Sequence, residues 1–356
     1  MSELSQDELE RLATQIKSWG QALGFQQLGV SDIDLNDHEQ HLLRWLNDGF
    51  HGEMEWMARH GTRRSRPDQL VEGTVRVICA RMDYLPGDAR PLRDIMQRTD
   101  TGVVSRYALG RDYHKVLRKR LQQLANRIEE AIGPHGYRVF VDSAPVLEKA
   151  LAEKAGLGWI GKHSNLLDRK AGSWFFLGEI YTDIPLPADR PLKNHCGDCT
   201  ACIDACPTGA IVAPYRVDAR KCISYLTIEL RGSIPEALRP LMGNRIYGCD
   251  DCQWVCPWNR FAQPSAESDF APRNGLDAPS LIRLFGWSEE QFLDRTAGSP
   301  IRRIGYECWL RNIAVALGNC QTQAEVVQAL KKRQSHPSAL VREHVQWALR
   351  QHKEQP

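Results

Sequence analysis

The sequence predicts a mixed α+β and α/β protein built from three successive parts. Helix-like and strand-like patterns alternate over its first half, eight of the eleven cysteines lie between residues 196 and 256, and only helix-like patterns follow residue 281. At 356 residues, the chain is long enough for two or three domains. We expect an α/β domain over residues 1–187, a cysteine-rich domain over residues 188–262 and an all-helical domain over residues 263–356.

The cysteine-rich segment has the spacing of iron-sulfur ligands. Four cysteines separated by three, three and four residues precede a proline, and a second group ends in the same Cys-Pro pair. In ferredoxins of this spelling, three thiolates bind one 4Fe-4S cube and the fourth ligates the other cube. The spacing therefore predicts a ferredoxin-like domain with two clusters. We assign the first cluster to Cys196, Cys199, Cys202 and Cys256, and the second to Cys206, Cys222, Cys249 and Cys252.

Zinc and disulfides match these cysteines less well. Zinc sites usually pair C-x-x-C units without a third close cysteine or Cys-Pro endings. A disulfide framework is typical of short secreted chains, whereas this chain is long and its first twenty residues do not resemble a secretory signal. Because Cys222 lies far upstream of its group, residues 223–248 form an insertion between ligands of one cluster, and such loops often carry function.

Composition is that of an ordinary globular chain, with 42% hydrophobic and 25% charged residues and a net charge of +2. No apolar run approaches the roughly 18 residues that a membrane span needs. We expect a cytoplasmic, monomeric protein that does not associate with membranes.

Two basic stretches lie in the first part. Residues 59–66 contain five arginine or histidine side chains, and residues 103–120 contain six Lys or Arg against one Asp at the start of a predicted helix that runs to Ile132. Each stretch is either a solvated surface or a site for an anion or a polar cofactor edge. Both possibilities remain open.

Asp142 directly follows a predicted strand over residues 137–141. Ligand crevices of open α/β sheets lie at the carboxyl ends of strands, so Asp142 is placed as a site carboxylate is placed. Beneath a large apolar ligand, its pKa would rise and it could donate a proton. Alternatively, Asp142 only helps Ser143 to cap a following helix that has Pro145 in its first turn.

Residues 156–161 spell G-x-G-x-x-G, but a helix pattern precedes them and a polar turn follows. A dinucleotide fingerprint requires the opposite order, so we interpret this stretch as a tight turn whose backbone approaches another segment closely.

The C-terminal part has three helix patterns, near residues 304–317, 326–330 and 340–349, which suggest stacked helix pairs of HEAT type. Residues 302–353 contain nine Lys or Arg against three Glu. Such an excess of positive charge fits a nucleic-acid footprint, although a solvated surface is the alternative.

Several long segments are distinctive beyond the cysteine spacing: residues 106–117 (RYALGRDYHKVL), 141–167 (VDSAPVLEKALAEKAGLGWIGKHSNLL), 172–180 (GSWFFLGEI) and 222–229 (CISYLTIE). Together with both cysteine groups, they resemble the epoxyqueuosine reductase family. The resemblance implies a cytoplasmic enzyme, akin to reductive dehalogenases, that carries cobalamin and two 4Fe-4S clusters. Such an enzyme takes electrons from an external donor and removes the epoxide oxygen of epoxyqueuosine at the tRNA wobble position, the last step of queuosine biosynthesis.

The resemblance also implies roles for single residues. Asp142 corresponds to the family's proton donor. The D-x-H-x-x-G sequence that supplies a cobalt-ligating histidine elsewhere is absent, so no protein histidine is expected on cobalt. The implied cobalamin contacts are Arg63, Ser105, Asp142, Asn165, Leu166, Thr227 and Glu229.

Two other functions remain open at this point. One is a corrinoid iron-sulfur reductase of the same architecture that acts on a small molecule. The other is a ferredoxin-type electron carrier or RNA-binding protein without catalysis.

Overall fold

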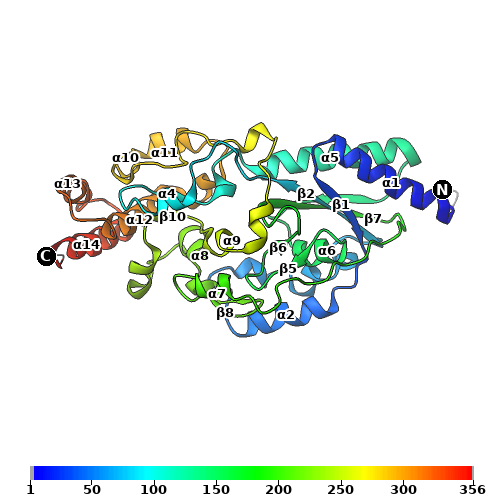
Figure 1. Cartoon of the computed structure of the whole chain (residues 1–356), viewed down its shortest axis with the longest axis horizontal. Helices are drawn as coiled ribbons and strands as arrows, with labels where there is room; N and C mark the ends of the chain where they lie inside the picture. The colour runs from blue at the N-terminus through cyan, green and yellow to red at the C-terminus, as the bar shows by residue number, and fades with distance from the viewer. Residues whose placement is uncertain (1–3, 355–356) are drawn as a thin grey trace.

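The computed structural model describes residues 4–354 and has three regions along its longest axis (Figure 1). A sheet with its helices lies at the N-terminal end, the cysteine-rich segment lies in the middle, and the last helices lie at the opposite end. The two termini consequently lie at opposite ends of the molecule.

The elements of the first region follow one another in short alternation. They are α1 (Gln6–Ala22), β1 (Gln27–Ser31), α2 (Asn36–Asn47), α3 (Pro67–Leu70), β2 (Arg76–Asp83), α4 (Leu92–Met96), β3 (Val103–Val104), α5 (Tyr113–Ile132), β4 (Tyr137–Phe140), α6 (Glu148–Lys154), β5 (Trp159–Ile160), β6 (Leu166–Leu167) and β7 (Phe175–Thr182).

The cysteine-rich segment and its insertion contain only short elements, and the last region contains only helices. The former are α7 (Ala201–Asp204), β8 (Ile211–Ala213), β9 (Arg216–Val217), α8 (Ile223–Ile228), β10 (Arg245–Tyr247) and α9 (Asp251–Trp254). The latter are α10 (Leu281–Phe285), α11 (Glu289–Arg295), α12 (Gly305–Gly318), α13 (Ala324–Lys332) and α14 (Ala339–Glu354).

The main sheet has four strands in the order β1-β2-β7-β4, and every neighbouring pair is antiparallel. The comparison with open α/β sheets, whose strands run parallel, is therefore wrong for this sheet. β7 runs between β2 and β4 in the direction opposite to both, so the carboxyl ends of the strands do not share one edge.

Side chains on alternate positions of these strands enter two separate cores. Ile78, Ala80 and Met82 of β2 pack with α1 and α5, whereas Val77 and Cys79 pack with α6 on the opposite face. This two-residue period is the one that a strand buried on both faces requires. Helices therefore cover both faces of the sheet.

The segment after β4 differs from the prediction. Residues 142–147 form turns, and α6 begins only at Glu148, so the predicted helix cap at Ser143 is wrong. Asp142 has a φ of 28°, a left-handed conformation that a helical first turn does not contain. The chain therefore turns sharply where Asp142 is presented.

The G-x-G-x-x-G stretch begins in a turn and approaches other segments closely, as predicted, but its Trp159 and Ile160 form β5. A Cβ atom on Gly158 would lie 2.2 Å from the carbonyl oxygen of Leu167, and one on Gly156 would lie 2.7 Å from that of Arg190. Only glycine permits these close approaches.

The insertion packs into the same apolar core as the last five helices. Arg311 of α12 is fully buried and donates hydrogen bonds to the carbonyl oxygens of Leu226, Leu230 and Gly232 at 2.7–2.8 Å. The neighbouring Asn312 donates to the carbonyl oxygen of Thr227 at 2.8 Å. The α12 helix thereby fixes the insertion backbone.

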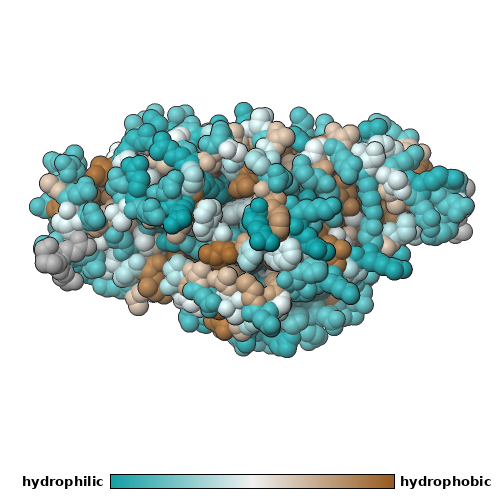
Figure 2. All heavy atoms as spheres, in the orientation of Figure 1, coloured by the Kyte–Doolittle hydropathy of each residue, from teal (hydrophilic) through white to brown (hydrophobic). Residues whose placement is uncertain are grey.

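The exterior is mostly hydrophilic, although apolar side chains gather over the middle of the face in Figure 2, around α9 and β8. Trp254 of α9 and Val212 of β8 are 45% and 41% exposed. Within residues 4–354, no helix is both long and apolar enough to cross a membrane.

Candidate active site

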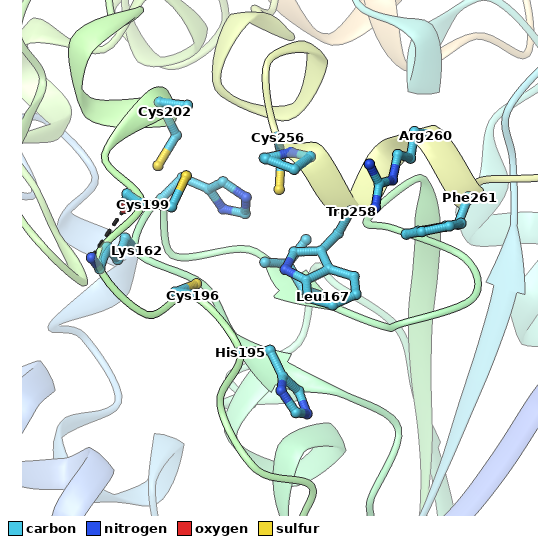
Figure 3. A pocket seen from close by; sticks show the side chains of 13 residues that line it. Lys162, Leu167, His195, Cys196, Cys199, Cys202, Cys256, Trp258, Arg260 and Phe261 are labelled. Carbon is cyan, nitrogen blue, oxygen red and sulfur yellow. Dashed lines mark hydrogen bonds between the residues drawn. The ribbon is translucent and has the colours of Figure 1, made fainter.

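The first predicted set of cysteines comes together around one cavity. Cys196, Cys199, Cys202 and Cys256 line a space of about 230 Å³. Figure 3 shows their sulfur atoms directed toward this space, with Trp258 beside it. Cys202 lies on α7, and Cys256 immediately precedes a 3-10 helix that Pro257 begins. Sequence-distant thiols are thus brought to one centre, as the ferredoxin spacing predicts.

The donor set fits an iron-sulfur cluster. Burial, followed by the proximity of Cys256, Cys196 and Cys199, raises the pKa of the Cys202 thiol to about 11. Cationic iron would offset this repulsion and hold the ligands as thiolates. Among residues 4–354, no three His, Cys, Asp or Glu side chains are grouped as ligands of a single metal ion.

The second set lines a larger cavity of about 520 Å³. Cys206, Cys222, Cys249 and Cys252 all contribute to its wall. Five residues predicted to contact cobalamin line the same cavity: Ser105, Asp142, Asn165, Leu166 and Glu229. The cluster ligands and the predicted acid therefore share one space.

A second cavity of about 870 Å³ adjoins this space. Asp142, Glu148, Lys149 and Ser164 line both cavities, which makes them parts of one cleft. The wall of the 520 Å³ cavity also contains five aromatic rings, those of Tyr84, Tyr107, Tyr113, Phe175 and Phe176. A cleft of this size with apolar walls and a few converging polar groups suits a large organic cofactor.

Two of the predicted cofactor contacts lie elsewhere. Thr227 is fully buried, accepts a hydrogen bond from the Gly248 amide at 2.9 Å, and is not part of either cavity wall. Arg63 is exposed and lines neither cavity, whereas the adjacent Arg64 is buried, lines the 870 Å³ cavity and donates to the Trp56 carbonyl oxygen. The basic loop thus contributes a different arginine from the predicted one.

Asp142 is held from one side by neighbours on α5. Its Oδ2 accepts a hydrogen bond from the Tyr113 hydroxyl and lies 3.1 Å from Nε2 of His114. The other ring nitrogen of His114, Nδ1, lies 2.7 Å from Oδ1 of Asp112. A histidine between two carboxylates is stabilised as the imidazolium, since both nitrogens then donate.

In the protein alone, the pKa of Asp142 lies below its ordinary value, and the rise expected beneath a bound apolar ligand stays a prediction. Burial raises it, but the hydrogen bonds from His114 and Tyr113, and the positive charges of His114 and Arg303, together lower it below its ordinary value. The side chain is 46% exposed because it faces the open cleft. Burial and the charge of Arg303 lower the pKa of His114, but the hydrogen bonds to Asp112 and Asp142 and the charge of Asp142 outweigh them and raise it. The proton of this pair therefore rests on His114.

Two further carboxyl groups lie behind Asp142. Burial, then the nearby Asp142 charge, raises the pKa of Glu148 from 4.5 to about 8. Glu179 of β7 is fully buried, and neither of its carboxylate oxygens has a hydrogen-bond partner among the described residues. Burial, and then the proximity of Glu148 and Asp142, raises the pKa of Glu179. Both glutamates are therefore protonated at neutral pH.

Comparison with known proteins decides the family. The chain is 63% identical over 352 residues to an epoxyqueuosine reductase from Pseudomonas aeruginosa, an alignment that covers 99% of this chain and 97% of the relative. The chain belongs to the epoxyqueuosine reductase family. An epoxyqueuosine reductase from Escherichia coli strain K12 is 59% identical over 345 residues, which cover 97% of this chain and 90% of the relative.

Family profiles match two segments of this chain. Residues 64–143 match a profile described as epoxyqueuosine reductase QueG, DUF1730, and residues 195–259 match a 4Fe-4S double cluster binding domain. A solved epoxyqueuosine reductase with an epoxyqueuosine-modified tRNA-Tyr stem loop superimposes with a TM-score of 0.87 at 27% identity, covering 96% of this chain and 90% of that one. Two 4Fe-4S clusters are accordingly part of the fold.

Sequence reasoning missed Tyr113, His114 and Glu148 as site residues. All three stand inside the segments that carried the family resemblance. The available signal was that each of these polar side chains stands among apolar residues of a predicted helix or turn. The sequence could not show that α5 and the start of α6 meet at Asp142.

Proposed function

We propose that this chain reduces epoxyqueuosine at the wobble position of the tRNA anticodon to queuosine, the last step of queuosine biosynthesis. One observation carries the proposal: Asp142 and all four cysteines of the second set line the same cavity. Electrons and a proton can therefore be delivered to one bound substrate. The names of the relatives supply the substrate, and the cavity supplies the chemistry that the substrate needs.

The cleft fits cobalamin. Ser105, Asn165, Leu166 and Glu229 would hold it beside the second cluster, and the 870 Å³ cavity has room for the rest of the molecule. When bound, cobalamin supplies the low-potential reduction that opens the oxirane C–O bond. Thr227 would contribute indirectly, because its hydroxyl accepts a hydrogen bond from the Gly248 amide and so holds the backbone beside the cleft. Arg63 has no contact with the cleft that supports its predicted role.

Asp142 and its neighbours handle the proton. Conversion of the oxirane to an alkene and water consumes two electrons and two protons. The protonated Nε2 of His114 lies 3.1 Å from Oδ2 of Asp142, and the carboxylate of Asp142 faces the cleft. Asp142 takes this proton and passes it to the oxygen that leaves the oxirane, and the Tyr113 hydroxyl keeps the carboxylate oriented. Asp142 thus acts as a relay rather than as an acid that is protonated at rest.

The C-terminal helices would extend the contact with tRNA. Six of their cations are exposed: Arg302, Arg303, Lys331, Lys332, Arg350 and Lys353. Arg311, which the sequence count included, is buried, as are His344 and His352, so none of these three side chains can reach phosphate. We propose that α12, α13 and α14 form a HEAT-type unit, which carries these charges together with the 3-10 helix Pro300–Ile304 that precedes it.

An external electron donor, a cytoplasmic location and a monomeric state complete the proposal. Cys199 of the first set is exposed, so electrons would enter there and pass to the second set. Cluster cysteines that must stay reduced suit the cytoplasm, where tRNA is also present.

The test is mass spectrometry of tRNA nucleosides from cells with and without the gene. Loss of the chain should replace queuosine by epoxyqueuosine, and the wild-type gene should restore queuosine. Unchanged nucleosides would contradict the substrate. A small-molecule reductase or an electron carrier would leave tRNA unaltered.

A further inference from the structure

His163 lies in the wall between the two cysteine-lined cavities. It lines both the 230 Å³ and the 520 Å³ cavity, and it is 5% exposed. The proposed mechanism gives this residue no role. The histidine follows the G-x-G-x-x-G turn, and a Cβ atom on Gly161 would lie 3.1 Å from Cε1 of its ring. Because Gly161 has no side chain, the His163 ring has room beside it.

The backbone fixes which nitrogen carries the proton. The amide of Asn165 donates a hydrogen bond to Nδ1 of His163 at 3.1 Å, so Nδ1 is an acceptor. In the neutral ring the proton is then on Nε2. Burial, followed by the charge of Lys149, lowers the pKa of His163 to about 4, so the ring is neutral at pH 7.

Nε2–H is a buried donor without a partner. It has no hydrogen-bond acceptor among the described residues and essentially no solvent contact. An unsatisfied buried donor costs about 1–3 kcal/mol, which indicates that an acceptor is supplied by something bound in the cavity. Both cavities that His163 lines have four cysteine thiols in their walls, a donor set that fits an iron-sulfur cluster.

The turn that carries His163 is fastened to the first set of cysteines. Nζ of Lys162 donates hydrogen bonds to the carbonyl oxygens of Gly197 and Cys199, at 2.6 and 3.0 Å. Figure 3 shows Lys162 reaching toward Cys199 at the edge of this cavity. His163 is therefore positioned against the cluster that Cys196, Cys199, Cys202 and Cys256 hold.

We propose that His163 donates a hydrogen bond from Nε2 to a sulfur of the first cluster and thereby raises the reduction potential of that cluster. Reduction adds negative charge to the cluster, and a donor to its sulfur stabilises the reduced state more than the oxidised state. The bond would ease electron entry at the exposed cluster. This proposal rests on the cluster assignment and not on the identity of the tRNA substrate.

The test uses the whole chain, reconstituted with iron and sulfide without air. Redox titrations followed by electron paramagnetic resonance compare wild type with His163→Leu and His163→Gln. Leucine removes the donor, whereas glutamine keeps an N–H group. We expect one cluster of His163→Leu to have a lower potential, the other cluster to be unchanged, and His163→Gln to lie closer to wild type.

A second measurement does not depend on potentials. Pulsed electron paramagnetic resonance of the reduced first cluster should detect the signal of an exchangeable proton. This signal should disappear in deuterium oxide and be missing in His163→Leu. The exposed His60 provides a matched control, since His60→Leu should change neither potential nor proton signal.

Three results would overturn the proposal. These are equal potentials in wild type and His163→Leu, equal shifts in the leucine and glutamine variants, and loss of iron from both variants, which would make His163 structural. Failure of the wild-type chain to bind two clusters would instead contradict the cluster assignment. Activity on tRNA enters none of these results.

Discussion

Asp142 combines a rare backbone conformation with a shared proton. Its φ of 28° is uncommon outside glycine and costs on the order of 1–3 kcal/mol. The bonds from Tyr113 and His114 hold the carboxylate in the cleft in spite of this cost. Its low pKa means that the acid form must be made during turnover. The site therefore depends on the whole Asp112–His114–Asp142 arrangement.

Asp142→Asn should bind both clusters and tRNA normally, because the side chain keeps its shape. Turnover should fall by about 10²- to 10⁴-fold, the usual contribution of a general acid. Iron content, tRNA binding and queuosine formation check this expectation. Asp294→Asn, an exposed change on α11, is the control. Full turnover in Asp142→Asn would exclude the acid role.

Glu148 predicts a pH dependence of stability. Its pKa rises from 4.5 to about 8 on folding, so the folded state binds a proton that the unfolded state releases. The resulting stabilisation is complete below pH 4.5 and is lost as pH rises through about 8. The melting temperature of Glu148→Gln should therefore depend less on pH between 5 and 8 than that of wild type, because glutamine has no proton to release.

The exposed Glu130 on α5 serves as the control for this experiment. Glu130→Gln should retain the wild-type slope of melting temperature against pH. An identical slope in Glu148→Gln would show that Glu148 is ionised in the folded protein.

At the scale of elements, local patterns were predictable and their meeting points were not. The capping boxes of α1 and α11 follow from Ser5 and Ser288, each with its partner three residues on. Cysteine spacing predicted two groups of four cysteines, and the structure places each group around its own cavity. The antiparallel sheet was not predictable, since alternation alone does not give strand direction.

The α12 helix and the insertion form one unit through Arg311. Arg311→Leu would leave three carbonyl oxygens without donors and should lower the free energy of unfolding by about 3 kcal/mol or more. The second set of cysteines should bind less iron, because the insertion directly follows its ligand Cys222 and would no longer be held in place. Iron content and chemical unfolding check both effects.

Arg311→Lys keeps the charge but cannot donate to Leu226, Leu230 and Gly232 at once, so it should be intermediate. Wild-type stability in Arg311→Leu would show that the insertion holds itself in place.

At the scale of the molecule, exposed cations at the two ends allow the proposed tRNA surface to be tested against a distant control. Lys331 and Lys332 lie on α13 at the C-terminal end, while Arg11 lies on α1 at the N-terminal end (Figure 1). Replacing both lysines by glutamine should weaken tRNA binding and reduce the slope of log affinity against log salt by up to about 2. Arg11→Gln should leave the slope unchanged. Equal slopes in all three proteins would place tRNA elsewhere.

The crossing of ligands between the two cysteine sets has a consequence for synthesis. Cys256 completes the set that Cys196 begins, whereas the other set is already complete at Cys252. Under the proposed ligand assignment, the cube whose ligands leave the ribosome first would be the last to receive its full set. Neither half of this segment would then bind two clusters when produced alone.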